Sequence, residues 1–345
     1  MYAERKNFKY LKNEKELSIY SHFQQGTRLF GQCIVSLPTN EIAHDFPLFF
    51  RVSKDGRVER FHNYVYAHPS DNCNTGVRSK DVNNNSARLY LPKITGKKQK
   101  FPLLMYIHGG GFSIESTFSS GHDKYLQSIV TKANVVALSV NYRLAPEHLL
   151  PTCYDDSWSV IRWTSLHVEM CDHFILTEET VMEPWLKDHV DFSRVFLASE
   201  SAGANIVHDM VVRASASEKP LGESFKIAGI ALIHPFFGNY EVDKYCSFVF
   251  PECEGLDVPR LNPAAHLRLL SSLICRKVIV FTAEKDFLRE RSLTYYDALK
   301  KSGWNGEVEI METQGEDHVF HLLEPNCEKA GLLMKRLVEF FNEKI

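Results

Sequence analysis

The chain has 345 residues, of which 44% are apolar, and its 40 basic and 43 acidic side chains give a formal net charge of −3. This apolar content is enough for a large core, and the mixed charges leave no basic patch with interleaved aromatic residues, which argues against nucleic-acid binding. The 8 cysteines are scattered without a C-x-x-C pair. Their spacing is not that of a zinc site, and it favours free thiols in a reducing compartment.

Residues 1–40 are mixed and charged, and they contain no apolar stretch typical of a signal peptide. No run in the chain has the length and apolar character of a membrane-spanning helix. We therefore expect no membrane association, and a cytoplasmic protein that could also enter the nucleus. We expect residues 1–40 to be an N-terminal extension, either disordered or an artefact of the gene model, and residues 41–345 to form one domain.

A β-hairpin is predicted near the start of this domain. Two runs rich in strand-forming residues, Phe49–Ser53 and Val58–Phe61, flank the turn residues Lys54-Asp55-Gly56. An Asp-Gly pair between two such runs is a strong hairpin signal, because both residues tolerate the backbone angles of a tight turn.

The rest of the chain alternates between two kinds of segment. The predicted strands are Ala87–Leu91, Leu103–Ile107, Val135–Val140, Val195–Ala198, Ile227–Ile233, Lys277–Thr282 and Val308–Glu312. The predicted helices are Tyr125–Lys132, Ser157–Leu166, Ala202–Ala214, Arg291–Lys301 and Glu328–Asn342. Continuous apolar strands that alternate with helices predict an α/β fold, with a mostly parallel central sheet and helices on both faces. Such sheets carry their sites at the carboxyl ends of the strands.

A glycine-rich loop follows the second of these strands. Three consecutive glycines, Gly109 to Gly111, stand between His108 and Phe112. Glycine permits backbone conformations that a β-carbon would forbid, so the loop can turn N–H groups toward a substrate carbonyl. This loop is typical of the oxyanion hole in lipases and esterases, and its plainer interpretation is a flexible turn.

A nucleophile elbow is predicted where the strand Val195–Ala198 passes into a helix. The residues Ser199-Glu200-Ser201-Ala202-Gly203 nearly match G-x-S-x-G, in which a tight turn lifts a serine hydroxyl above the sheet. The N–H of Ala202, the residue after the serine, would then face a developing oxyanion. Ser199 departs from the motif, and the alternative is a helix start capped by Ser199 or Ser201.

An acid and a base follow the elbow in chain order. Asp286 comes after the strand Lys277–Thr282, and His318 lies in the loop after Val308–Glu312. An imidazole must take the proton of a serine nucleophile, and a carboxylate holds the imidazole in the right tautomer. We assign these roles to His318 and Asp286, with His321 and Glu284 as competitors.

Two further polar stretches are expected to support the fold. The loop Asn141–His148 contains a Glu and a His, but its proline and its place after a strand favour an architectural role. The pair Asp155-Asp156 stands alone near a helix start, where acidic side chains favour the positive end of the helix dipole. We expect neither a metal nor a cofactor.

The chain resembles the plant carboxylesterases of the hormone-sensitive-lipase-like branch of the α/β-hydrolases. The resemblance extends from Glu41 to the C-terminus and is carried by Glu41–Pro47, Lys54–Arg60, His108–Phe112, Asn141–His148, Ser199–His208, Ala283–Asp286 and Glu316–His321. It implies a triad of Ser201, Asp286 and His318, an oxyanion hole of Gly109, Gly110 and Ala202, and no cofactor. It also implies a small helical cap from the N-terminal segment and the Pro235–Arg276 region.

Two departures from this family's pattern stand out. Ser199 replaces a glycine, so its β-carbon should crowd the elbow. The Pro235–Arg276 stretch is shorter than usual, so the cover over the site should be reduced or reshaped.

The resemblance implies a serine hydrolase that acts on small carboxylic esters. The alternative is an elimination enzyme, because this branch includes 2-hydroxyisoflavanone dehydratases. Those enzymes often carry threonine in place of the nucleophilic serine. A third hypothesis is a hormone-binding protein similar to the gibberellin receptors, which lack the catalytic histidine that this chain retains as His318. A fourth hypothesis is a decaying paralogue.

Overall fold

The computed structural model describes residues 41–71, 74–84, 86–96, 98–173, 182–216, 221–238, 244–251 and 258–343, without the side chains of 169–173. The predicted N-terminal extension and parts of the expected cap lie outside the described residues, so the predicted domain division stays a prediction. Residues Glu41–Ile345 make up one compact unit.

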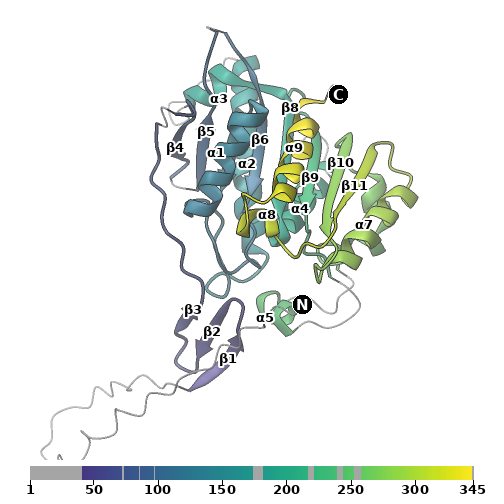
Figure 1. Cartoon of the computed structure of the whole chain (residues 1–345). Helices are drawn as coiled ribbons and strands as arrows, with labels where there is room; N and C mark the ends of the chain where they lie inside the picture. Colours follow the sequence, from purple (N-terminus) through teal and green to yellow (C-terminus); the bar gives the residue numbers. More distant parts are fainter. Residues whose placement is uncertain are drawn as a thin grey trace, which may run out of the picture. The chain divides into compact units, whose positions relative to one another are not determined.

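An eight-stranded sheet forms the centre of this unit, in the order β11-β10-β9-β8-β6-β7-β5-β4 (Figure 1). Its strands are β4 (Arg78–Val82), β5 (Ala87–Leu91), β6 (Phe101–Ile107), β7 (Val136–Val140), β8 (Val190–Glu200), β9 (Ile227–Ile233), β10 (Lys277–Ala283) and β11 (Glu307–Thr313). The strands from β7 through β6, β8, β9 and β10 to β11 pair in parallel, while β5 is antiparallel to both neighbours. This confirms the predicted mostly parallel sheet, and every strand predicted from the sequence is present.

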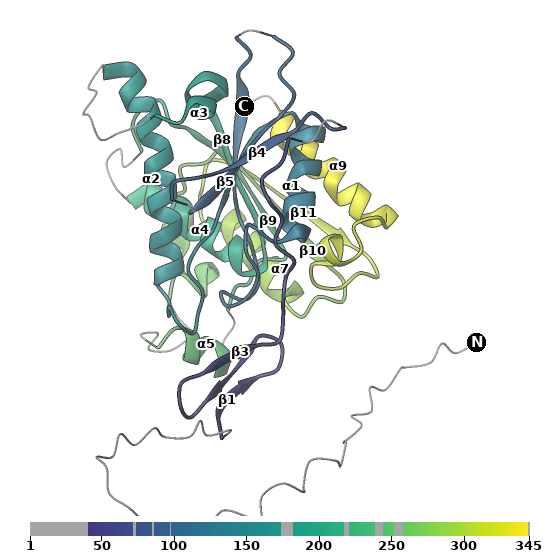
Figure 2. The same cartoon turned by 90° about the vertical axis from the view of Figure 1, so that its left-hand side faces the viewer.

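Helices cover both faces of the sheet. In Figure 2, α2, α3 and α4 lie on one side of the strands, and α1 and α9 lie on the other. The helices are α1 (Ser120–Ala133), α2 (Thr152–His173), α3 (Pro184–His189), α4 (Ser201–Ala216), α5 (Lys244–Val249), α6 (Leu267–Ser271), α7 (Arg289–Lys301), α8 (Phe320–Leu323) and α9 (Glu328–Asn342). Strands β5, β6, β7 and β9 are buried over their whole length because both of their faces are covered.

A second, three-stranded antiparallel sheet precedes the main one. It consists of β1 (Ile42–Phe46), β2 (Phe50–Ser53) and β3 (Val58–Arg60). The pairing of β2 with β3 confirms the predicted hairpin, and Gly56 adopts the left-handed conformation that its turn requires. The N-terminal segment therefore contributes strands to the cap, which corrects the expectation of a helical contribution. The described helical part of the cap includes α5.

Strand β4 was missed by the sequence analysis. Its residues Arg78-Ser79-Lys80-Asp81-Val82 are mostly polar because the strand lies at the edge of the sheet, half exposed. No helix among the described residues is long and apolar enough to cross a membrane.

Candidate active site

Ser201 stands at the junction of β8 and α4, where the chain reverses sharply. Its φ is 53°, a left-handed value that is rare for a residue with a β-carbon. The turn brings α4 close to β6, and a β-carbon at Gly203 would lie 2.6 Å from the carbonyl oxygen of His108. A backbone strained at one residue and crowded by its neighbours is the geometry of a nucleophile elbow.

The elbow accommodates Ser199 by using its hydroxyl. The side chain is fully buried, and Ser199 Oγ donates to the carbonyl oxygen of Ile107 in β6. Ser201 Oγ, in turn, faces the loop after β11. Since these hydroxyls make other contacts, the alternative of a serine-capped helix start finds no support.

Ser201, His318 and Asp286 lie in one hydrogen-bonded line. His318 Nε2 is 3.0 Å from Ser201 Oγ, and His318 Nδ1 is 3.0 Å from Asp286 Oδ2. Asp286 is 4% exposed, and its Oδ1 also accepts the N–H of Leu288 at 2.8 Å. The carboxylate is thereby held toward the imidazole, and the imidazole toward the serine.

The two competitors for these roles lie elsewhere. His321 is buried, and neither of its ring nitrogens has a hydrogen-bond partner among the described residues. Burial, together with the nearby His318 and His122, lowers the pKa of His321 to about 3. Glu284 accepts the N–H of Gly315 at 2.7 Å instead of meeting an imidazole.

The glycine loop after β6 is hydrogen-bonded to the elbow through its first glycine, which the sequence did not predict. The Gly109 N–H donates to Glu200 Oε1 at 2.6 Å, so this N–H is not free to hold an oxyanion. This corrects the role expected for Gly109. Gly110 is left-handed at φ 96° and follows directly. The Ala202 N–H belongs to the first turn of α4, where backbone donors have no partner within the helix.

Glu200, immediately before Ser201, belongs to a cluster of charged and polar side chains in the interior that the sequence did not reveal. His122 Nε2 lies 2.9 Å from Glu200 Oε1, and His122 Nδ1 lies 3.4 Å from Glu115 Oε2. The Tyr106 hydroxyl donates to the second oxygen of Glu200. The only sequence signal was a glutamate inside the elbow motif.

This cluster keeps opposite charges together in the interior. Burial disfavours a charged His122, but the two carboxylates outweigh it and raise the pKa of His122 to about 9. Burial likewise disfavours charge on Glu115, yet hydrogen bonding and attraction from His122 lower the pKa of Glu115 to about 2. The pKa of Glu200 is also lowered, chiefly by His122 against the burial cost. His122 therefore stays cationic near neutral pH.

Cap residues contact the same glycine loop from outside. The Tyr245 hydroxyl, from α5, donates to the Gly111 carbonyl and lies 2.6 Å from Ser113 Oγ. Phe49, just before β2, stacks on the Tyr245 ring with 4.2 Å between ring centroids. Arg60 in β3 donates to the Ser113 carbonyl at 2.8 Å. Both parts of the cap thus fix the loop that carries Gly110.

The loop Asn141–His148 supports the site, as expected. The Tyr142 hydroxyl is within 2.9 Å of the His108 carbonyl and 3.1 Å of the Gly109 carbonyl. Glu147 accepts from Arg60 at 2.8 Å. The acidic pair nearby is split, because Asp156 pairs with Arg143 and Asp155 with Arg213.

One group of side chains has the composition of a metal site. Ligand atoms of His234, Asp286 and His318 lie within 4.8 Å of one another. Each is already engaged, since His318 Nδ1 and Asp286 Oδ2 face each other and His234 Nδ1 accepts the N–H of Val319. The arrangement is that of a hydrogen-bonded cluster around the acid and the base.

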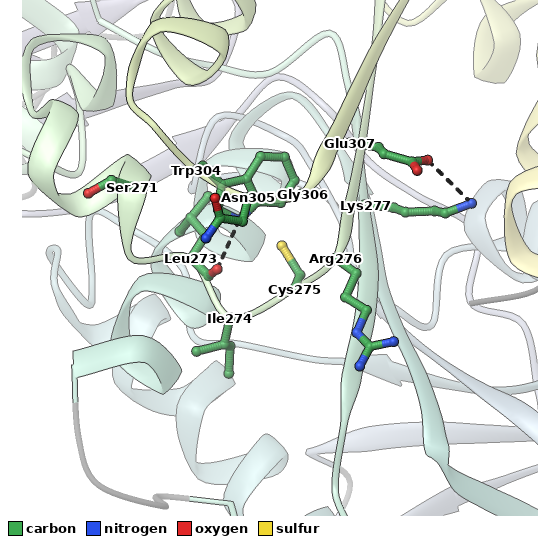
Figure 3. Close-up of a pocket in the computed structure, with 10 residues that line it drawn as sticks. All are labelled: Ser271, Leu273, Ile274, Cys275, Arg276, Lys277, Trp304, Asn305, Gly306 and Glu307. Atoms are coloured by element: carbon green, nitrogen blue, oxygen red, sulfur yellow. Dashed lines mark hydrogen bonds and ion pairs between the residues drawn. The ribbon is translucent and has the colours of Figure 1, made fainter.

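A pocket of about 560 Å³ opens at the end of the sheet away from Ser201, near the amino ends of β10 and β11. Figure 3 shows Cys275, Arg276 and Lys277 along one side and Trp304 and Glu307 along the other. Burial raises the pKa of Cys275 to about 12, so its thiol stays protonated and unreactive near neutral pH. The pocket has no nucleophile–base pair.

Comparison with known proteins places this geometry among hydrolases. A model of the α/β-hydrolase fold family matches residues 104–322. The chain is 41% identical to probable carboxylesterase 2 of Arabidopsis thaliana over 312 residues, 85% of this chain and 94% of that protein. It is 39% identical to a 2-hydroxyisoflavanone dehydratase of Glycyrrhiza echinata over 324 residues, 88% of this chain and 97% of that protein. An esterase structure from Pyrobaculum calidifontis shares the fold, with a TM-score of 0.57 at 24% identity over 74% of this chain and 80% of that one.

Proposed function

Because the chain belongs to the α/β-hydrolase family, among the relatives of the plant carboxylesterases, we propose that it is a serine carboxylesterase acting on small carboxylic esters. The observation that carries this proposal is the line from Asp286 through His318 to Ser201, with both hydrogen-bond distances at 3.0 Å. Serine alone is a weak nucleophile, and an adjacent base oriented by a carboxylate is the arrangement that activates it.

The reaction follows from these positions. Ser201 Oγ attacks the ester carbonyl carbon while His318 Nε2 takes its proton, and Asp286 stabilises the resulting imidazolium. The N–H groups of Gly110 and Ala202 hold the oxygen that becomes negative. His318 then gives the proton to the departing alkoxide, which leaves as the alcohol. Water attacks the acyl-enzyme with His318 again as base, and the acid is released.

The test uses purified wild-type protein and Ser201→Ala, with p-nitrophenyl acetate and p-nitrophenyl butyrate at neutral pH. We expect turnover by the wild type and a loss of at least about 10³-fold in kcat for the variant. Ser193→Ala is the matched control, because Ser193 is an exposed serine of the same strand β8. Equal turnover by wild type and Ser201→Ala would overturn the proposal.

The second candidate function is elimination of water from a 2-hydroxyisoflavanone-like substrate. The dehydratase among the relatives favours it, since that protein matches 88% of this chain. The same base and oxyanion donors would serve, with no need for a covalent bond to Ser201. Release of the dehydrated product without ester cleavage, retained in Ser201→Ala and lost in His318→Ala, would support this function over the first.

We further propose a cytoplasmic location, with the nucleus as an additional one. The support is that Cys153, Cys275 and Cys327 carry free thiols, as is usual in reducing compartments. Imaging of the full chain fused at its C-terminus to a fluorescent protein tests it, and signal confined to an organelle other than the nucleus would contradict it.

A further inference from the structure

His234 lies where β9 ends, between the strands that carry the nucleophile and the acid. Strand β9 pairs with β8 on one side and β10 on the other. The residue is fully buried, and its φ of 48° is left-handed, although it carries a large side chain. Its own N–H donates to the carbonyl of Phe281 in β10 at 2.8 Å. A bulky residue in this conformation is costly, which suggests that its placement serves a purpose.

The side chain of His234 holds the loop that carries the base. His234 Nδ1 accepts the N–H of Val319 at 2.8 Å. Val319 follows His318 directly and is itself left-handed, with φ of 49°. The two rings of His234 and His318 have centroids 5.7 Å apart. The backbone N–H that follows His318 is thus held by the side chain of His234.

The same turn holds the nucleophile. Two residues after His234, the Phe236 N–H donates to the Ser201 carbonyl at 3.0 Å. The segment from His234 to Phe236 therefore contacts the backbone of Ser201 at one end and that of the His318 loop at the other. These are the two residues whose side chains must stay within hydrogen-bonding distance.

We propose that His234 is a positioning residue that sets the distance and angle between His318 and Ser201 through its hydrogen bond to Val319. This inference rests on the proposed esterase function. The hydrogen bond requires a neutral imidazole with its proton on Nε2, because a protonated Nδ1 cannot accept.

The surroundings of His234 keep it neutral. Charged or titratable groups face it from every side: Asp286 after β10, His318 and His321 around α8, and Glu200 at the end of β8. Burial and the neighbouring His321 together lower the pKa of His234 far below its usual value, and they outweigh the attraction of Asp286, whose Oδ2 is 3.9 Å from Nδ1. His234 therefore remains an acceptor near neutral pH.

The test compares two substitutions of His234. His234→Phe keeps a ring of similar shape but has no acceptor, whereas the Oδ1 of His234→Asn can occupy the place of Nδ1. For p-nitrophenyl acetate we expect kcat to fall about 10- to 100-fold in His234→Phe with KM within about twofold, because a misplaced base slows the chemical step. His234→Asn should recover kcat to within about fivefold of wild type.

A matched control separates positioning from general stability. His208 is another buried histidine, on α4, packed between Phe237 and Tyr295. His208→Phe makes the same chemical change away from the triad, and it should lower the melting temperature without lowering kcat at 25 °C. Should His234→Phe fail to fold, His234→Gln replaces it, because its acceptor sits one methylene further out and should displace the loop and lower kcat.

A second measurement does not depend on turnover. The proton on His318 Nδ1, in its hydrogen bond to Asp286, should give a downfield ¹H NMR signal in wild type and His234→Asn that is shifted or lost in His234→Phe. An unchanged signal and unchanged kcat in a folded His234→Phe would overturn the inference. Wild-type protein without Ser201-dependent turnover would instead overturn the proposed function, while the signal would still report on the positioning.

Discussion

The carboxylate of Glu200 accepts the N–H of Gly109 at 2.6 Å, which ties the residue before Ser201 to the first glycine of the loop after β6. The two residues are 91 positions apart in the chain. The same oxygen of Glu200 also faces His122 at 2.9 Å. The backbone before Ser201 and the loop that carries Gly110 are thus joined through one buried carboxylate that faces the cationic imidazole of His122.

This link predicts that Glu200 supports the chemical step. Glu200→Ala should lower kcat for p-nitrophenyl acetate about 10- to 100-fold with little change in KM, because the loop carrying Gly110 loses its anchor. Glu200→Gln should lose less, since its amide oxygen still accepts from Gly109. The exposed Glu339 on α9 provides the control Glu339→Gln, and equal kcat in Glu200→Ala and this control would contradict the prediction.

The buried charges predict a fall in stability at alkaline pH. The folded-state pKa of His122, about 9, lies above its usual 6.5. His122 therefore contributes stability that is fully present below pH 6.5 and is lost as pH rises through about 9. We expect the free energy of unfolding in urea to drop by roughly 1–3 kcal/mol across this window. His122→Gln should show a flatter profile, and identical slopes for the two proteins would contradict this account.

The contribution of Glu115, in the same cluster, to the free energy of unfolding has the opposite pH dependence. The folded-state pKa of Glu115, about 2, lies below its usual 4.5. Its contribution is present above pH 4.5 and is lost as pH falls through about 2. Glu115→Gln should therefore be less stable than wild type at pH 6 and approach it near pH 2, as measured by the same urea titrations on wild type and variant.

The packing of the elbow predicts that a smaller residue is tolerated at position 199 and that a larger one is not. Ser199→Gly removes the crowded side chain and restores the usual residue of the motif, so kcat should stay within about threefold of wild type. Ser199→Val adds a branched side chain that cannot donate to Ile107, in a site with no exposed surface. It should lower the melting temperature and soluble yield, because overpacking a dense interior costs about 1–3 kcal/mol. A soluble, fully active Ser199→Val would show that the elbow has more room.

Replacing glycine by alanine should have opposite effects on stability at Gly203 and at Gly331. A β-carbon at Gly203 would meet the backbone carbonyl of His108 at 2.6 Å, so Gly203→Ala should destabilise the fold and displace Ser201. Gly331 in α9 has open space around its β-carbon position. Gly331→Ala should stabilise the protein by about 0.5–1 kcal/mol, since alanine loses less backbone entropy in a helix. Thermal melting of both variants checks the pair.

The strands and the hairpin were predictable because their signals are local. A continuous apolar run specifies a strand buried on both faces, and an Asp-Gly pair specifies a tight turn. Ser201, Asp286 and His318 could be chosen for a similar reason. Each follows a predicted strand closely, and the carboxyl ends of parallel strands share one edge of the sheet. The edge strand β4 lacked the apolar signal, and the expected helical character of the N-terminal cap was wrong because its residues pair as strands.

The sequence by itself determined where the strands lie along the chain and which polar side chains follow them. Only the tertiary structure decided how those side chains are paired. It buried His321 and turned His318 toward Ser201, although both lie in the same short segment. It paired the Gly109 N–H with the Glu200 carboxylate. It also paired the Val319 N–H with the imidazole of His234, which is 85 positions away in the chain. Such pairings depend on which buried donors and acceptors come within about 3 Å of each other. That distance is fixed by the packing of the whole sheet and is not contained in any local pattern.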